Sequence, residues 1–254
     1  MNDIIHFEND DGEKLAATLQ MPEKNSGRAV VMGHCFTCSR HIRLLIDLSR
    51  DLARAGFMTL RFDFSGNGQS EGDFAQTSYS KHIGEMKKAV SLVREKGAEW
   101  IGLAGHSMGS AVSLLTGADV DDVRAVCTIG GRYSQLNPLH LFTEIQKREL
   151  KETGKVSFTS RGKPLELNQT FFQDAVQHDL AKAVQSLNKP LLIIHGDQDD
   201  IIPVEAAYQG RDLNPAGVEL VIIEGADHMF LSEDHRRRVS DRAVAWFTRL
   251  ANGR

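Results

Sequence analysis

The chain has 254 residues, of which 41% are hydrophobic and 25% charged, and 30 Lys plus Arg against 34 Asp plus Glu give a formal net charge of -4. This composition excludes collagen, low-complexity disorder and membrane proteins, and the mixed, slightly acidic charge argues against a partner nucleic acid. The acidic N-terminus has no apolar signal core and the three cysteines are too few for a disulfide framework, so we expect a cytoplasmic protein that does not enter the membrane.

Short runs of Val, Ile and Leu alternate along the chain with amphipathic segments of helical period, a pattern typical of repeated β-α-β units. Segments 4–7 and 15–19, separated by Asp-Asp-Gly, predict a leading antiparallel hairpin. Because the later strands are apolar on both faces, we expect a parallel sheet covered by helices. These strands are predicted at 28–33, 57–62, 100–104, 123–129, 190–194 and 218–223. Helices are predicted at 40–55, 80–96, 108–118, 204–213 and 233–252, the last with Ser232 as its N-cap.

Residues 131–189 interrupt this alternation, because no central strand is predicted there and the segment is too long for a plain loop. It contains a helical pattern at 139–152, a small hairpin at 155–167 and a second helical pattern at 169–184. We interpret residues 131–189 as a small cap insertion within one domain that spans residues 1–254. A peripheral excursion without a role in substrate binding is the alternative.

The predicted strand at 100–104 runs into the sequence GHSMG at 105–109, and a helix follows at once. This is the G-x-S-x-G nucleophile elbow, in which a sharp turn between strand and helix projects the hydroxyl of the serine, here Ser107. Such a serine needs a histidine as base and a carboxylate that orients the histidine. His228 follows the strand at 218–223, and the sequence HGDQDDIIP at 195–203 follows the strand at 190–194. Asp197, Asp199 and Asp200 are all candidates for the acid.

With these motifs the chain resembles the serine esterases of the α/β-hydrolase superfamily over most of its length. In that superfamily HGxxDxxxP supplies the acid and GxxH the base, which implies Asp199 and His228. The resemblance also implies an α/β-hydrolase fold, with a mostly parallel eight-stranded sheet and helices on both faces. The segments GHCFTCSR at 33–40, RFDFSGNGQSEGDF at 61–74 and SRGKPLELNQTFFQD at 160–174 resemble the hydrolase half of bacterial fusions with an osmotically inducible domain.

Acyl transfer also requires hydrogen-bond donors for the developing oxyanion. One is the backbone N–H of Met108, which follows the nucleophile. The segment after the strand at 28–33 resembles the HGF loop of single-domain carboxyl and cinnamoyl esterases, which implies the backbone N–H of Phe36 as the second donor. Cys35 stands where that loop usually has glycine. The pair Cys35 and Cys38 also matches the C-x-x-C pattern of a redox dithiol, which is the alternative for this loop.

The remaining histidines near these motifs are interpreted as structural. His106 lies beside the nucleophile but is turned away from it, and His34 and His195 end strands, where they are expected to order the following loops. No histidine pair lies at metal-ligand spacing, so we expect neither a metal nor another cofactor.

The sequence therefore predicts a serine esterase that cleaves small-molecule carboxylic esters as a monomer or homodimer. Apolar residues of the cap insertion are expected to line the substrate pocket, with Leu139, Phe142, Phe171 and Phe172 as candidates. A serine aminopeptidase or an acyl thioesterase would use the same three residues. The aminopeptidase requires a carboxylate for the substrate ammonium, for which Glu144, Glu149 and Glu152 are candidates. A non-catalytic module that binds a ligand or partner is the alternative of another class.

Overall fold

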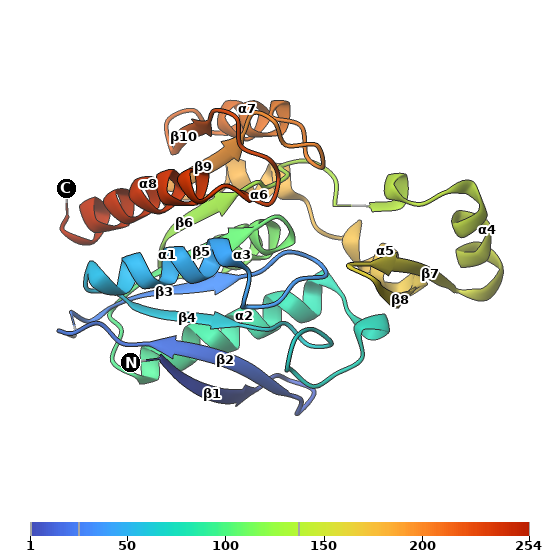
Figure 1. Ribbon diagram of the computed structural model, residues 1–254, viewed down its shortest axis with the longest axis horizontal. Coiled ribbons are helices and arrows are strands. Elements are labelled where there is room, and N and C mark those ends of the chain that lie inside the picture. Colours follow the sequence, from blue (N-terminus) through green and yellow to red (C-terminus); the bar gives the residue numbers. More distant parts are fainter. Residues whose placement is uncertain (1, 25, 137, 254) are drawn as a thin grey trace.

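The computed structural model describes residues 2–24, 26–136 and 138–253. Among these residues, eight strands form one sheet in the order β1-β2-β4-β3-β5-β6-β9-β10 (Figure 1). The strands are β1 (Asn2–Glu8), β2 (Lys14–Gln20), β3 (Arg28–Gly33), β4 (Met58–Phe62), β5 (Trp100–His106), β6 (Val123–Ile129), β9 (Leu191–Gly196) and β10 (Val218–Ile223). The pairs β1–β2 and β2–β4 are antiparallel and the other neighbours are parallel. The predicted hairpin and mostly parallel sheet are confirmed.

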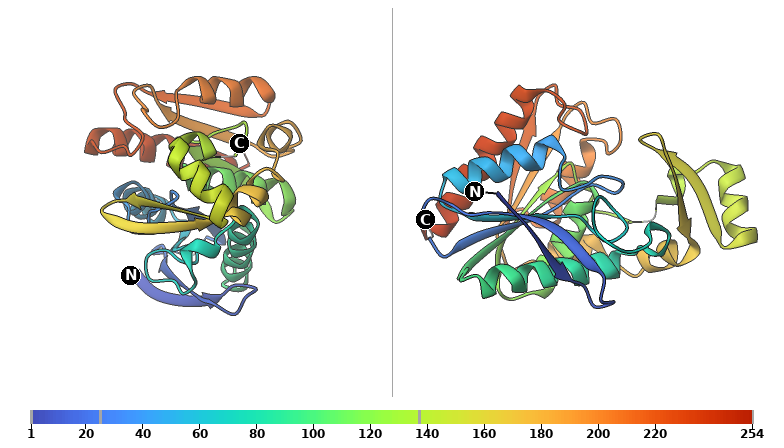
Figure 2. Two further views of the ribbon diagram at one scale, coloured as in Figure 1. Left: turned by 90° about the vertical axis from the view of Figure 1, so that its right-hand side faces the viewer. Right: turned by 60° about the horizontal axis from the view of Figure 1, so that its bottom comes forward.

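Helices cover both faces of the sheet (Figure 2). On one face lie α1 (Arg43–Arg54) and α8 (Glu233–Ala251), and on the other α2 (Tyr79–Glu95), α3 (Met108–Asp119), α6 (Leu180–Gln185) and α7 (Glu205–Leu213). Strands β4 and β9 are buried at every position because both of their faces meet helices. Ser232 occupies the N-cap of α8, but its side chain makes no capping hydrogen bond. No helix among the described residues is both long and apolar enough to cross a bilayer.

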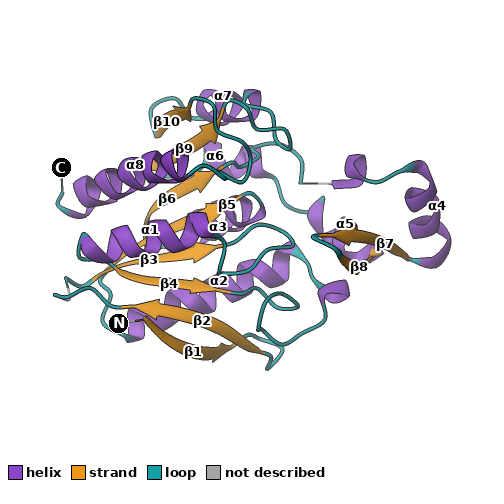
Figure 3. Cartoon of the chain, viewed as in Figure 1, coloured by secondary structure: helices purple, strands orange, loops and turns teal. Residues whose placement is uncertain are grey.

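Between β6 and β9 the chain projects beyond the carboxyl ends of the parallel strands (Figures 1 and 3). The projecting part contains η2 (Pro138–Leu141), α4 (Glu144–Thr153), the hairpin β7 (Lys155–Ser160) and β8 (Lys163–Asn168), and α5 (Gln169–Ala175). The helical pattern at 169–184 corresponds to two separate helices, α5 and α6 (Leu180–Gln185). Asp179 accepts a hydrogen bond from the backbone N–H of Lys182 at 2.9 Å and so starts α6, which packs against α3.

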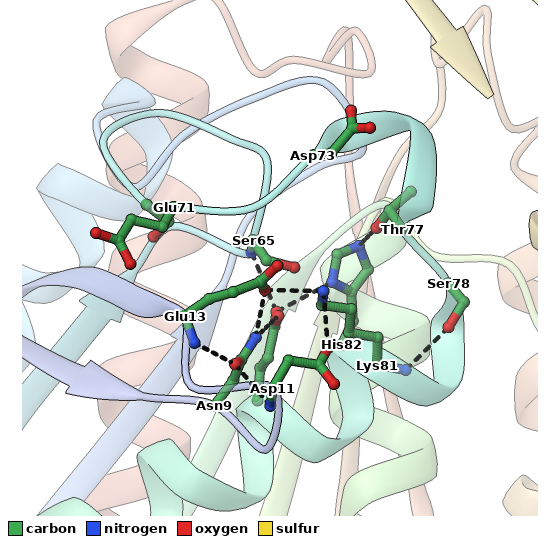
Figure 4. A network of polar contacts seen from close by, with 12 residues as sticks. Asn9, Asp11, Glu13, Ser65, Glu71, Asp73, Thr77, Ser78, Lys81 and His82 are labelled. Atoms are coloured by element: carbon green, nitrogen blue, oxygen red, sulfur yellow. Dashed lines mark hydrogen bonds and ion pairs between the residues drawn. The ribbon is translucent and has the colours of Figure 1, made fainter. Parts of the chain in front are cut away.

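A buried polar network joins the turn between β1 and β2 to the loop after β4 and to α2 (Figure 4). Glu85 accepts hydrogen bonds from Asn9, from His82 Nδ1 at 3.1 Å and from the backbone N–H of Ser65. Burial opposes ionisation of Glu85, but these hydrogen bonds, led by that of His82, lower its pKa. His82 is held from its other side by Thr77, 2.7 Å from Nε2. Because its polar groups form hydrogen bonds with one another, the network fixes the position of the loop after β4.

Candidate active site

Ser107 stands on the turn between β5 and α3 with φ of 55°, a left-handed conformation that a residue other than glycine adopts only under constraint. A Cβ atom at Gly105 would collide with the carbonyl oxygen of Gly109, and one at Gly109 with that of Gly33. Both glycines are therefore required for the close approach of β5, α3 and β3. The predicted nucleophile elbow has the geometry that its sequence implies.

Asp199 and His228 are in direct contact. Asp199 Oδ2 lies 2.7 Å from His228 Nδ1, and Oδ1 accepts the backbone N–H groups of Ile201 and Ile202 at 2.9 and 2.7 Å. Burial opposes ionisation of Asp199, but hydrogen bonds from His195, His228 and Ile202 hold its pKa well below the usual range. The carboxylate is therefore ionised and orients the imidazole.

The other two candidate acids do not reach His228. Asp197 accepts the backbone N–H of Gly225 at 2.7 Å, and Asp200 is exposed. The structure brings to the histidine Asp199, the aspartate that the resemblance implies.

One cavity of about 600 Å³ contains Ser107, His228, Met108 and Phe36 in its wall. Within the described residues, the backbone N–H groups of Phe36 and Met108 make no hydrogen bond, and neither does the hydroxyl of Ser107. Two unused donors and an unused hydroxyl thus meet at one opening. Met108 is the first residue of α3, so the positive end of the helix dipole also lies there.

The wall of this cavity is aromatic and only partly as predicted. Phe142 and Phe171 line it, whereas Leu139 and Phe172 are not among the residues of the wall. Phe172 is buried behind the wall, with its ring 5.5 Å from that of Phe171 and 5.7 Å from that of Phe142, and Leu139 packs against the core. The sequence did not point to several other apolar lining residues, namely Tyr79, Leu136, Pro138, Phe158 and Ile202.

The charged residues of the cavity wall are cations. Arg132 and Arg161 line it, and no Asp or Glu of the described residues does. Of the three glutamates considered for an aminopeptidase, Glu144 pairs with Lys147, Glu149 accepts hydrogen bonds from Ser157, and Glu152 is exposed. None of them faces the cavity.

His106 contacts the backbone of His228. Its Nε2 lies 2.8 Å from the backbone carbonyl oxygen of His228, which can only accept, so Nε2 carries the proton. Burial, followed by the neighbouring His228, lowers the pKa of His106 to about 3, and Arg161 adds to this effect. His106 is therefore neutral and acts on the position of His228.

His195 and His34 order loops, as expected from their places at strand ends. His195 Nε2 lies 2.8 Å from the carbonyl oxygen of Ile202, in the loop of the acid. His34 Nδ1 donates to the carbonyl oxygen of Cys35 at 2.7 Å, while Nε2 accepts the backbone N–H of Phe64 at 3.1 Å. No group of three or more His, Cys, Asp or Glu in the described ranges is arranged to hold a metal ion.

Cys35 and Cys38, the two cysteines of the C-x-x-C pattern, form a disulfide across the loop that contains Phe36. The two cysteines are three positions apart in the chain. A tight turn, in which the backbone N–H of Cys38 donates to the carbonyl oxygen of Cys35 at 3.0 Å, brings their sulfur atoms together. The third cysteine, Cys127, is buried and unpaired, and burial raises the pKa of its thiol.

Comparison with known proteins identifies the family. Residues 26–183 match the family described as serine aminopeptidase, S33, and residues 162–235 match the α/β-hydrolase fold family. The chain belongs to the S33 family of α/β hydrolases. The chain is 27% identical over 185 residues to the mitochondrial palmitoyl-protein thioesterase ABHD10 of Rattus norvegicus, a match that covers 68% of this chain but only 59% of that relative. It is 24% identical over 225 residues to the AB hydrolase superfamily protein YisY of Bacillus subtilis, with coverage of 76% and 82%.

Solved structures agree with this assignment. Est1E from Butyrivibrio proteoclasticus, solved with ferulic acid, is 25% identical with a TM-score of 0.83, and 98% of this chain and 100% of that chain are covered. The esterase domain of a Rhodothermus marinus protein is also 25% identical, with a TM-score of 0.77 and 98% coverage of both chains. The predicted α/β-hydrolase fold and superfamily are confirmed, and the proteins similar to this chain include esterases and a thioesterase.

Proposed function

We propose that this hydrolase cleaves carboxylic esters through an acyl-enzyme formed on Ser107. The main support is the contact of 2.7 Å between Asp199 Oδ2 and His228 Nδ1, beside a cavity that contains both His228 and Ser107. Because the carboxylate accepts the Nδ1 proton, Nε2 of the neutral imidazole keeps a lone pair for the proton of the serine.

In the proposed reaction, Ser107 Oγ attacks the ester carbonyl carbon while His228 Nε2 takes the hydroxyl proton. The backbone N–H groups of Phe36 and Met108 donate to the oxyanion of the tetrahedral intermediate. When the bond to the alcohol breaks, His228 returns the proton to the alcohol oxygen. Water then attacks the acyl group on Ser107, again with His228 as base, and the carboxylic acid leaves as Ser107 regains its proton.

Thioester hydrolysis is the second candidate, and one observation favours it. The curated relative in Rattus norvegicus is a palmitoyl-protein thioesterase, and the aromatic cavity wall around Phe142, Phe158 and Phe171 suits an apolar acyl group. Aminopeptidase activity fits less well, although the family description names it. A substrate ammonium would meet Arg132 and Arg161 but no carboxylate in the described wall. A purely binding module would not need an activated base.

Turnover of 4-nitrophenyl esters of increasing acyl length, measured beside amino-acyl 4-nitroanilides and acyl thioesters, tests the proposal. We expect ester hydrolysis, and we expect Ser107→Ala to abolish it together with covalent labelling by an organophosphonate. Ser134→Ala, which removes an exposed hydroxyl outside the cavity, is the matched control and keeps both. Label that persists on Ser107→Ala, or anilide turnover that exceeds ester turnover, would contradict the proposal.

A further inference from the structure

A second cavity, of about 550 Å³, adjoins the one that contains Ser107. The two cavities share five residues in their walls, namely Thr37, Cys38, Ser160, Arg161 and Met229. Met229 follows His228 in the chain, and Cys38 lies two positions after Phe36. The shared boundary is therefore next to both the proposed base and the proposed oxyanion loop.

The second cavity is strongly basic. Its wall contains Arg43, Arg161, Lys163 and Arg236, and no Asp or Glu among the described residues. Arg236 is paired with Asp47 at 2.8 Å. The part of the chain that the structure describes contains no ion-pair partner for the other three cations. An anion in this cavity would meet several positive charges and no negative one.

Arg161 is the cation on the boundary, and its donors are poorly used. Its Nη2 lies 3.1 Å from Cys38 Sγ and 3.7 Å from Met229 Sδ. Sulfur is a weak acceptor, and a guanidinium has five N–H donors in a planar fork that matches the two oxygens of a carboxylate or phosphate. No oxygen acceptor for Arg161 is present within the described residues, so its fork is available to a ligand.

The backbone of Arg161 does not explain why an arginine stands there. Arg161 and Gly162 form the two-residue turn between β7 and β8, with φ of 52° and 74°. A turn with two positive φ values favours Asn-Gly, because asparagine tolerates the left-handed region better than arginine does. Non-glycine residues with positive φ are few in the described chain, namely Ser107, Arg161 and Phe230, and the first two line the Ser107 cavity.

We propose that Arg161 binds an anionic group, a carboxylate or a phosphate, on the alcohol portion of the ester substrate. This inference rests on the proposed ester hydrolysis. The aromatic cavity suits the acyl portion, while the alcohol leaves past His228, beside which Met229 and Arg161 form the boundary with the basic cavity. The preferred substrate is an apolar acyl ester whose alcohol carries a negative charge, and Arg43 and Lys163 add to the attraction.

Matched ester pairs test this inference. The purified hydrolase is given 3-(butanoyloxy)benzoate and its uncharged analogue 3-(butanoyloxy)benzamide, which share acyl group and shape. A third probe, 3-(butanoyloxy)phenyl phosphate, distinguishes a phosphate from a carboxylate. The measured quantity is the ratio of kcat/KM for the anionic ester to that for the neutral one. Comparing this ratio between variants cancels the difference in intrinsic reactivity of the two esters.

Arg161→Asn suits the turn and removes the charge, so we expect it to fold and to lower the ratio about tenfold, mainly through KM for the anionic ester. Arg161→Lys should retain part of the preference. Arg148→Gln, which removes an exposed arginine of α4 outside both cavities, is the matched control and should leave the ratio unchanged. Raising the salt concentration from about 0.05 to 0.5 M should reduce the wild-type ratio, because the guanidinium is exposed.

An unchanged ratio in Arg161→Asn, with hydrolysis still dependent on Ser107, would overturn the inference and leave the proposed function intact. A preference for anionic esters that appears only when the charge is on the acyl side, as in mono-4-nitrophenyl succinate against its methyl ester, would also overturn it. If the wild-type protein hydrolyses none of the esters, the proposed function itself is refuted.

Discussion

Arg40 and Asp63 form a wholly buried ion pair that joins the loop containing Phe36 to the loop after β4. The guanidinium contacts Asp63 Oδ2, and the backbone N–H of Arg40 donates to Oδ1 at 2.6 Å. Arg40 also donates to Gln69 Oε1 at 2.5 Å. The segments 33–40 and 61–74, which are separate in the sequence, are thus one structural unit that positions the proposed oxyanion donor.

Removal of one partner of this pair should be costly. Arg40→Met leaves the Asp63 carboxylate buried without its cation, so we expect the free energy of unfolding in urea to fall by about 3–5 kcal/mol. The double variant Arg40→Met with Asp63→Asn removes both charges of this pair and should recover part of that loss. A single variant as stable as the wild type would show that water or another group compensates the carboxylate.

The contact between Asp199 and His228 predicts a catalytic role for one aspartate of three. Asp199→Asn should lower kcat by about 10⁴, as the same change does in a serine-protease triad, because the histidine tautomer is no longer fixed. Asp197→Asn is the matched control, since that side chain faces Gly225, and should cost far less. Steady-state kinetics on one 4-nitrophenyl ester measures both. A larger loss in Asp197→Asn than in Asp199→Asn would refute the assignment.

Two substitutions test separately what the backbone N–H and the side chain of Phe36 contribute to activity. Phe36→Ala keeps the donor and loses contacts with the rings of Phe74, Phe158 and Phe171, so KM should rise more than kcat falls. Phe36→Pro removes the donor and should lower kcat by about 10² to 10³. Circular dichroism and phosphonate labelling of Ser107 confirm that each variant is folded. Near-normal kcat in a folded Phe36→Pro would exclude this N–H from the oxyanion site.

The buried His106 predicts a pH dependence of stability. Burial, then the neighbouring His228, lowers its pKa to about 3 in the folded protein, from 6.5 for an ordinary histidine. As the pH falls below about 6.5, the unfolded chain binds a proton that folded His106 does not, and stability falls by up to about 1.4 kcal/mol per pH unit. His106→Gln keeps an N–H donor for the carbonyl oxygen of His228 but does not titrate.

Urea unfolding of the wild type and His106→Gln at several pH values measures this effect. We expect the wild-type free energy of unfolding to fall more steeply between about pH 6.5 and 5, and the two slopes to coincide above about pH 7.5, where histidine is neutral in both states. Equal slopes over the whole range would mean that His106 takes up a proton without unfolding.

Much of the fold and of the candidate site follows from local sequence. Apolar runs predict the central strands within a few residues, because a strand that is buried on both faces needs apolar side chains at nearly every position. Ser107 and His228 follow predicted strand ends, and the carboxyl ends of parallel strands meet at one edge. The break between α5 and α6 was not predicted, and the C-x-x-C pattern left open whether Cys35 and Cys38 are joined. Each feature depends on where the backbone turns rather than on hydrophobic period.

The sequence by itself determined the order of strands and helices, the nucleophile elbow and the group of aspartates that contains Asp199. The resemblance implied Asp199 among them, and only the tertiary structure shows its contact with His228 and which side chains line the cavity. It also placed Arg161 against Cys38 and Met229, which are 123 and 68 positions away in the chain. The physical reason is that local patterns restrict backbone conformation and burial, whereas contacts across such separations form only when a projecting hairpin packs over the edge of the sheet.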